Sequence, residues 1–234
     1  MASSLVFPVE CEICEALLPP SRSHGICEKC ASDVRLIPAP HCPACGRNIN
    51  FASGNVNKCA ECFGETFHFD RAFACTLYDG TMKELLHAYK FRNRTLLKDF
   101  LSEIMVRFIT LHLDPGVFDA FAAVPLDTAK KNTRGFNQSA LVCSRVSKKF
   151  DKPDISQKLG REKSPFTQSL LKRSERKSNV QGRFFVKDLS MFSGKNILLM
   201  DDILTTGQTA SECARVLKKA GARSVTVLAL ARGA

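Results

Sequence analysis

The sequence predicts an α/β protein in which a mainly parallel sheet with flanking helices follows a small cysteine-rich module. Eight of its eleven cysteines form four C-x-x-C pairs before residue 63. After residue 70, short apolar runs alternate with stretches of helical periodicity, which is typical of parallel strands joined by crossover helices. Because 234 residues can hold a small module and one globular core, we predict two domains, residues 1–68 and 69–234.

The C-x-x-C pairs predict metal sites in the first domain. Each pair presents two thiolates about one tetrahedral edge apart, so two pairs complete a four-sulfur zinc site. About 11 to 13 residues separate successive pairs, which is the length of a small hairpin. The spacing leaves open which pairs share an ion. We expect one or two structural zinc ions, bound by Cys11, Cys14, Cys27, Cys30, Cys42, Cys45, Cys59 and Cys62.

Other uses of these cysteines agree less well with the sequence. A disulfide framework requires an oxidising compartment, and no secretory signal precedes the pairs. Iron–sulfur ligation usually has less regular spacing, and a thioredoxin-like pair explains one C-x-x-C but not four. His24 and His41 lie near the pairs, but eight thiols leave no need for them as ligands. Cys75, Cys143 and Cys213 have apolar neighbours, so we expect them in the core.

The second domain reads as alternating strands and helices up to a long polar stretch. We predict strands at residues 72–78 and 120–124 and helices at 82–89, 96–113 and 137–150. Residues 151–182 have few apolar anchors, and we expect a mobile loop with one helical piece there. Strands at 197–200 and 224–231 then flank a helix at 207–220. Ligands of parallel sheets bind at the carboxyl ends of the strands, where the loop after Val124 and the residues after Met200 lie.

The segment after Met200 carries the most specific chemistry. Asp201 and Asp202 follow the apolar run, and the turn Thr205-Thr206-Gly207 leads into a helix. The turn directs N–H groups and hydroxyls to one place before a helix N-terminus, which suits a phosphate. Paired carboxylates accept hydrogen bonds from vicinal hydroxyls or help to hold magnesium, whereas an ordinary capped corner does not require them. The predicted ligands of a phosphorylated sugar are Asp201, Asp202, Thr205, Thr206, Gly207, Gln208 and Thr209.

Basic charge is concentrated in one part of the chain. The net charge is +11, and residues 127–195 contain 17 Lys and Arg against 6 Asp and Glu, an excess equal to that of the whole chain. Such a segment attracts a polyanion such as pyrophosphate or a nucleic-acid backbone. A solvated basic loop without a specific partner is the alternative.

The segment at 201–209 resembles the 5-phosphoribosyl-1-diphosphate (PRPP) motif of type I phosphoribosyltransferases. The resemblance implies that Asp201 and Asp202 bind the ribose hydroxyls, that residues 205–209 bind the 5′-phosphate, and that magnesium accompanies PRPP. It also implies a type I phosphoribosyltransferase-like fold for the second domain.

Further motifs resemble the ComF/GntX branch of that group. Residues 123–126 and 134–138 are similar to its pyrophosphate loop, which implies that Lys130 and Arg134 bind pyrophosphate. Residues 168–171 and 176–184 are similar to its mobile loop, with implied roles for Gln168, Arg176 and Asn179. The segment Lys90-Phe91, Tyr78 and the N-terminal C-x-x-C pairs also match this branch. Three phenylalanines are expected to pack in the core or at hinges and not to stack on bases: Phe91, Phe136 and Phe184.

The resemblance implies a protein that binds PRPP and single-stranded DNA in DNA uptake during natural transformation, with DNA-uptake machinery proteins as candidate partners. The main alternative is a phosphoribosyltransferase acting on a free nucleobase or related small acceptor. A third is a PRPP-sensing regulator that reads duplex DNA. Fold does not decide whether transfer occurs, and no side chain in the motifs is an evident general base, so the catalytic residues stay unassigned.

Composition indicates where the protein works. Hydrophobic residues make up 44% and charged residues 24%, as in ordinary soluble proteins. No apolar run approaches the roughly 20 residues that a bilayer span requires. Residues 1–8 lack the basic region of a signal peptide. We therefore expect a cytoplasmic protein without membrane insertion.

Overall fold

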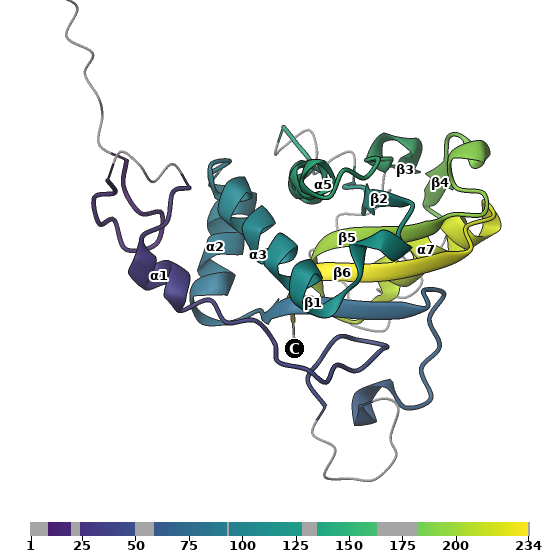
Figure 1. Ribbon diagram of the computed structural model, residues 1–234, viewed down its shortest axis with the longest axis horizontal. Helices are drawn as coiled ribbons and strands as arrows, with labels where there is room; N and C mark the ends of the chain where they lie inside the picture. The colour runs from purple at the N-terminus through teal and green to yellow at the C-terminus, as the bar shows by residue number, and fades with distance from the viewer. Residues whose placement is uncertain are drawn as a thin grey trace, which may run out of the picture.

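The centre of the molecule is a four-stranded parallel sheet in the order β1-β6-β5-β2 (Figure 1). The computed structural model describes residues 9–19, 24–49, 59–92, 94–127, 135–162 and 182–233. The strands of the sheet are β1 (Arg71–Leu77), β2 (Ala120–Ala123), β5 (Asn196–Leu204) and β6 (Ser224–Arg232). The predicted α/β fold class is confirmed.

Helices cover both faces of the sheet. The longer ones are α2 (Gly80–Phe91), α3 (Leu97–His112), α5 (Gln138–Lys149) and α7 (Gln208–Lys219). Alternate residues of β5 separate the two faces, because successive side chains of a strand point to opposite sides. Leu198 and Met200 belong to the apolar cluster of α2, α3 and α5, whereas Ile197 and Leu199 belong to that of α7. No helix in the described ranges is long and apolar enough to cross a membrane.

Short elements complete the chain. They are α1 (Glu28–Ser32), η2 (Ala60–Cys62), η3 (Pro115–Val117), η4 (Ser156–Lys158) and η6 (Leu189–Met191). In addition, β3 (Leu159–Arg161) pairs with β4 (Phe184–Val186) as an antiparallel two-stranded sheet. Ile155, Leu159 and Phe184 anchor this region because all three are buried in the α7-side core. The predicted mobile loop is therefore wrong for residues 151–162, and residues 163–181 lie outside the described residues.

The strand that carries the acidic pair is longer than predicted. Instead of ending at Met200, β5 continues to Leu204, and its pairing with β6 extends from Asp201 opposite Ala229 to Leu204 opposite Arg232. The Arg232 guanidinium donates a hydrogen bond of 2.8 Å to the carbonyl oxygen of Leu204. The strand β5 is longer than predicted because β6 continues to Arg232, so the backbone of β5 after Met200 has a neighbouring strand to pair with.

The cysteine-rich segments pack directly on the larger domain. We call Cys11, Cys14, Cys27 and Cys30 the first cysteine cluster, and Cys42, Cys45, Cys59 and Cys62 the second cysteine cluster. Buried members of the first cluster share the apolar core of α2 and α3, and α1 lies beside α2 in Figure 1. The segment of the second cluster lies along β1, where Ala72 donates its N–H to the carbonyl of Pro43 at 2.7 Å. The domain boundary at residue 68 stays a prediction.

Candidate functional site

The acidic pair lies at the carboxyl end of β5, where it meets α2 and α5. Asp202 forms an ion pair with Lys90, whose Nζ lies 2.7 Å from Oδ2, and both side chains are largely buried, at 18% and 13% exposed. Asp201 accepts hydrogen bonds at its Oδ1 from the Ser139 hydroxyl (3.4 Å) and from the N–H of Asp202 (2.8 Å). The two carboxylates are thus held by groups from three separate elements.

Burial and a neighbouring carboxylate change the proton affinity of Asp201. Burial, and then the neighbouring Asp202 carboxylate, raise the pKa of Asp201 to about 7, although Lys90 and Ser139 act against the shift. An approaching cation or hydroxyl-rich ligand would relieve this unfavourable charge. The site is therefore suited to bind magnesium or vicinal hydroxyls, because either ligand would stabilise the ionised carboxylates.

The turn after β5 has the geometry of an anion-binding site. Thr205 and Thr206 are exposed, whereas Gly207 is buried with φ of 76°, in the left-handed region that favours glycine. Gln208 and Thr209 open α7 and are half-buried. N–H groups in the first turn of a helix have no intrahelical partner, and together with the helix dipole they favour a bound phosphate. All seven predicted sugar-phosphate residues therefore lie together at one edge of the sheet.

The start of α5 lies beside the acidic pair at the same edge of the sheet. Asn137 caps the helix by accepting from the Ser139 N–H, and its amide donates to the carbonyl of Val124 at 3.0 Å, just after β2. The Tyr89 hydroxyl donates to the carbonyl of Gln138 at 3.2 Å, which links α2 to α5. These bonds fix the ends of β2, α2 and α5 around the acidic pair.

Some residues of this edge were missing from the predicted site. Lys90 lies in the segment Lys90-Phe91, which resembles the ComF/GntX branch, but its contact with Asp202 depends on the packing of α2. Ser139 had no indication in the sequence. Arg161 approaches the same region from β3: burial lowers its pKa, Asp127 and more weakly Asp201 act against the shift, and its guanidinium carbon lies 5.1 Å from the ring centre of Phe184.

The remaining predicted ligands of this site lie outside the described residues. These are Lys130, Arg134, Gln168, Arg176 and Asn179. Their assignments stay predictions.

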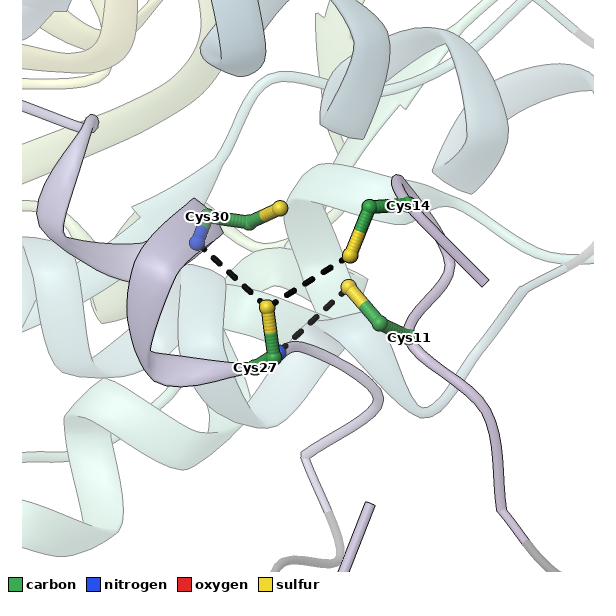
Figure 2. A group of neighbouring side chains, drawn as sticks. All are labelled: Cys11, Cys14, Cys27 and Cys30. Carbon is green, nitrogen blue, oxygen red and sulfur yellow. Dashed lines mark hydrogen bonds between the residues drawn. The ribbon is translucent and has the colours of Figure 1, made fainter. Parts of the chain in front are cut away.

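The eight cysteines of the C-x-x-C pairs form two separate groups of four. In each cluster the four sulfur atoms lie within 4.8 Å of one another. The Sγ atoms of Cys14 and Cys27, and those of Cys45 and Cys59, are 3.6 Å apart, close to the edge of about 3.8 Å of a tetrahedron with zinc–sulfur bonds of about 2.3 Å. Figure 2 shows the side chains of the first cluster converging from two turns of the chain. The donor set and spacing fit structural zinc, and consecutive pairs share each site.

Backbone N–H groups help to stabilise the thiolate of one cysteine in each cluster, Cys11 and Cys42, whereas the pKa of Cys30, Cys45 and Cys62 is raised. Burial opposes ionisation of Cys11, but N–H groups including that of Cys27 (3.4 Å from Sγ) outweigh it and lower its pKa to about 7. A hydrogen bond from Cys45, assisted by backbone N–H groups, lowers the pKa of Cys42 to about 4. His24 faces Glu103 and His41 contacts the carbonyl of Ile37, and among the described residues the two groups that could hold a metal consist of cysteines.

Comparison with known proteins agrees with this arrangement. A family model described as a double zinc ribbon domain matches residues 2–63, and one described as a phosphoribosyl transferase domain matches residues 137–234. Competence protein F of Haemophilus influenzae is 25% identical over 89% of this chain and 91% of its own. Competence protein ComFC of Bacillus subtilis is 30% identical over 88% of this chain and 84% of its own. The chain belongs to the ComF family.

A third member, DNA utilization protein YhgH of Escherichia coli, is 29% identical over 97% of this chain and 99% of its own. Membership of the ComF family confirms the resemblance seen in the motifs. The match to the phosphoribosyl transferase domain covers α5, β5, α7 and β6, but not α2, which supplies Lys90. The double zinc ribbon match spans all eight cysteines of the two clusters.

Proposed function

We propose that this ComF-family protein binds PRPP with magnesium at the carboxyl edge of the sheet and single-stranded DNA on a neighbouring surface, in DNA uptake. One observation carries the PRPP assignment. The acidic pair, the left-handed Gly207 and the N-terminus of α7 meet at one edge of the parallel sheet. A ribose ring with a 5′-phosphate carries vicinal hydroxyls and an anion, which match the carboxylates and the N–H groups respectively.

Magnesium fits the same carboxylates. It prefers oxygen ligands and usually takes one or two carboxylates together with phosphate oxygens of the ligand. Asp201 and Asp202 would supply those oxygens, and the ion would add positive charge next to the diphosphate. Lys90 now compensates Asp202 at 2.7 Å, so it would be free to turn toward the ligand once magnesium binds.

A thermal-shift titration tests PRPP binding. Magnesium and PRPP at about 100 times the dissociation constant should stabilise the wild-type protein by about 2.7 kcal/mol, or several degrees in melting temperature. The control is Thr110→Ala, on α3 away from the carboxyl edge of the sheet. Magnesium and PRPP should raise its melting temperature as much as that of the wild-type protein. A melting temperature that does not move in the wild-type protein would exclude this site for PRPP.

Single-stranded DNA is proposed on the outer surface of α2. Phe91 is expected to pack in the core or at a hinge, but it is 63% exposed, so a core position is wrong. Its ring centre lies 4.9 Å from that of His87. Lys83, His87 and Arg92 line a cavity of about 530 Å³ beside the Cys11–Cys14 turn, together with acidic Glu12 and Glu84. Exposed aromatic rings flanked by cations are what successive bases and phosphates of a single strand require.

The competence and DNA-utilization names of the relatives concern those proteins, and they support the same proposal for this chain. The net charge of +11 favours a polyanion. We propose a cytoplasmic location and a role beside proteins of the DNA-uptake machinery.

Fluorescence anisotropy with a labelled oligothymidylate tests DNA binding. Binding should persist at physiological salt and fall with a salt slope that reflects the phosphates contacted. Phe91→Ala should weaken it by about 5- to 100-fold, the usual cost of one lost stacking platform. Leu111→Ala, which truncates a 59%-exposed side chain on α3, is the control. Loss of wild-type binding below physiological salt, or equal effects of both variants, would argue against the proposal.

Transfer of the phosphoribosyl group to a free nucleobase is the second candidate function. The match to a phosphoribosyl transferase domain favours it. Product analysis with magnesium, PRPP and a panel of nucleobases separates the two. Nucleotide formation at a useful rate would favour the transferase, whereas PRPP binding without product would favour the DNA-handling role.

A further inference from the structure

Phe67 joins the second cysteine cluster to the turn that we propose as the phosphate loop. It lies five residues after Cys62 and is only partly buried. Its side chain packs against two apolar clusters at once. One contains Cys42, Cys45 and Cys62, and the other contains the inner residues of α7 and the sheet.

The ring of Phe67 lies directly against the left-handed glycine of the loop. A Cβ added to Gly207 would be 3.1 Å from Cε1 of Phe67, closer than ordinary van der Waals contact. The next residue strengthens the contact, because His68 donates its N–H to the Ser211 hydroxyl in the first turn of α7 at 3.0 Å. Phe69 stacks on Phe67 with ring centres 4.8 Å apart and is itself buried.

The second cluster is fixed to the sheet independently of Phe67. Gly46, at the end of the Cys42–Cys45 turn, lies so close to β1 that a Cβ there would be 2.5 Å from the amide nitrogen of Ala74. Asp70 accepts the N–H of Val225 at 2.7 Å and pairs with Lys218 of α7. A metal that ties Cys59 and Cys62 to this fixed turn would therefore hold residues 62–70, and with them the ring, in place.

We propose that Phe67 is a positioning residue for the loop Thr205–Thr209, and that through it PRPP affinity depends on metal occupancy of the second cysteine cluster but not of the first. This rests on the proposed PRPP site. Without metal, the thiols of Cys59 and Cys62 lose their common anchor, and the ring no longer restrains Gly207. The described packing of the first cluster is instead against α2 and α3.

Calorimetric titration of magnesium and PRPP into the full-length zinc-loaded protein tests the role of the ring. Phe67→Ala should weaken binding by at least about fivefold, the lower end of typical coupling energies, with zinc content unchanged. Phe67→Tyr, which keeps the ring, should restore it. Phe63→Ala is the matched control, because Phe63 lies in the same segment and is 80% exposed. Wild-type affinity in a folded Phe67→Ala protein would overturn the inference.

Paired cysteine variants test the role of the metal. Cys59→Ser/Cys62→Ser should lose one zinc per chain and at least about fivefold in PRPP affinity, and Cys11→Ser/Cys14→Ser should lose one zinc with a change of less than about twofold. Faster hydrogen exchange at residues 205–211 in the first variant alone would report the loosened loop directly. Equal effects of the two variants would overturn the inference. A wild-type protein that does not bind PRPP would overturn the proposed function as well.

Discussion

At the scale of single residues, the charges of Asp201, Asp202 and Lys90 determine the electrostatics of the candidate site. Asp201 and Asp202 are adjacent and largely buried, and Lys90 compensates only one of them directly. The protein therefore stores unfavourable electrostatic energy where a ligand is expected, which is common at functional sites. We test the charge of Asp201 and the compensation of Asp202 by Lys90 separately.

Asp201→Asn should stabilise the ligand-free protein at high pH. A carboxyl whose pKa is raised to about 7 binds its proton more tightly in the folded than in the unfolded state. Stability is therefore lost as pH rises from about 4 to about 7. Removing the charge should recover about 2 to 4 kcal/mol at pH 8 and almost nothing at pH 4. Urea unfolding at both pH values measures this, and an equal effect at both would contradict it.

Lys90→Met should destabilise the ligand-free protein, because the partly buried Asp202 carboxylate loses the ammonium 2.7 Å away. We expect a loss of about 1–3 kcal/mol in the free energy of unfolding. Lys98→Met, at a half-buried position in the first turn of α3, serves as the control. Saturating magnesium and PRPP should shrink the difference between Lys90→Met and wild type. A destabilisation that the ligand leaves unchanged would place Lys90 outside the site.

At the scale of elements, the sequence motifs predicted the local structure of the site, but they did not predict how the elements pack. The acidic pair, the turn and α7 were predicted because their chemistry is local: apolar run, carboxylates, glycine, helix. The hairpin of β3 and β4 was missed because Ile155, Leu159 and Phe184 are spread over a polar stretch, and only contact with α7 reveals them as anchors. Likewise, the extension of β5 depends on the length of β6, which no local pattern shows.

The docking of the second cysteine cluster on β1 can be tested with two glycines. Gly46 has φ of 74° and no room for a Cβ beside the Ala74 backbone, whereas Gly64 has φ of 80° and nothing within 4 Å. Gly64→Ala should cost only about 1 kcal/mol for the left-handed backbone. Gly46→Ala should cost at least about 3 kcal/mol, since backbone cannot move aside cheaply. Chemical denaturation compares them, and equal costs would show that the turn does not depend on its contact with β1.

At the scale of the whole molecule, the structure combines the first cysteine cluster, the second cysteine cluster and the α/β domain, which follow one another in the sequence. The two cysteine clusters pack on different regions of one α/β domain, the first on α2 and α3 and the second on β1. The proposed PRPP site is at the carboxyl edge of the sheet, and the proposed DNA surface is on α2. Lys90 and Phe91 are neighbours on that helix, but Lys90 faces Asp202 while Phe91 is exposed. We therefore propose that one chain binds two ligands at two separate places.

The double variant Asp201→Asn/Asp202→Asn tests this claim most directly. Calorimetry with magnesium and PRPP, and anisotropy with a labelled oligothymidylate, would be measured on the same preparation after its fold is checked by circular dichroism. We predict that PRPP binding is abolished while oligonucleotide affinity stays within about twofold, since the phosphate contacts of a DNA strand do not need these carboxylates. Equal loss of both affinities in the folded variant would contradict the account and show that PRPP and DNA share a single site.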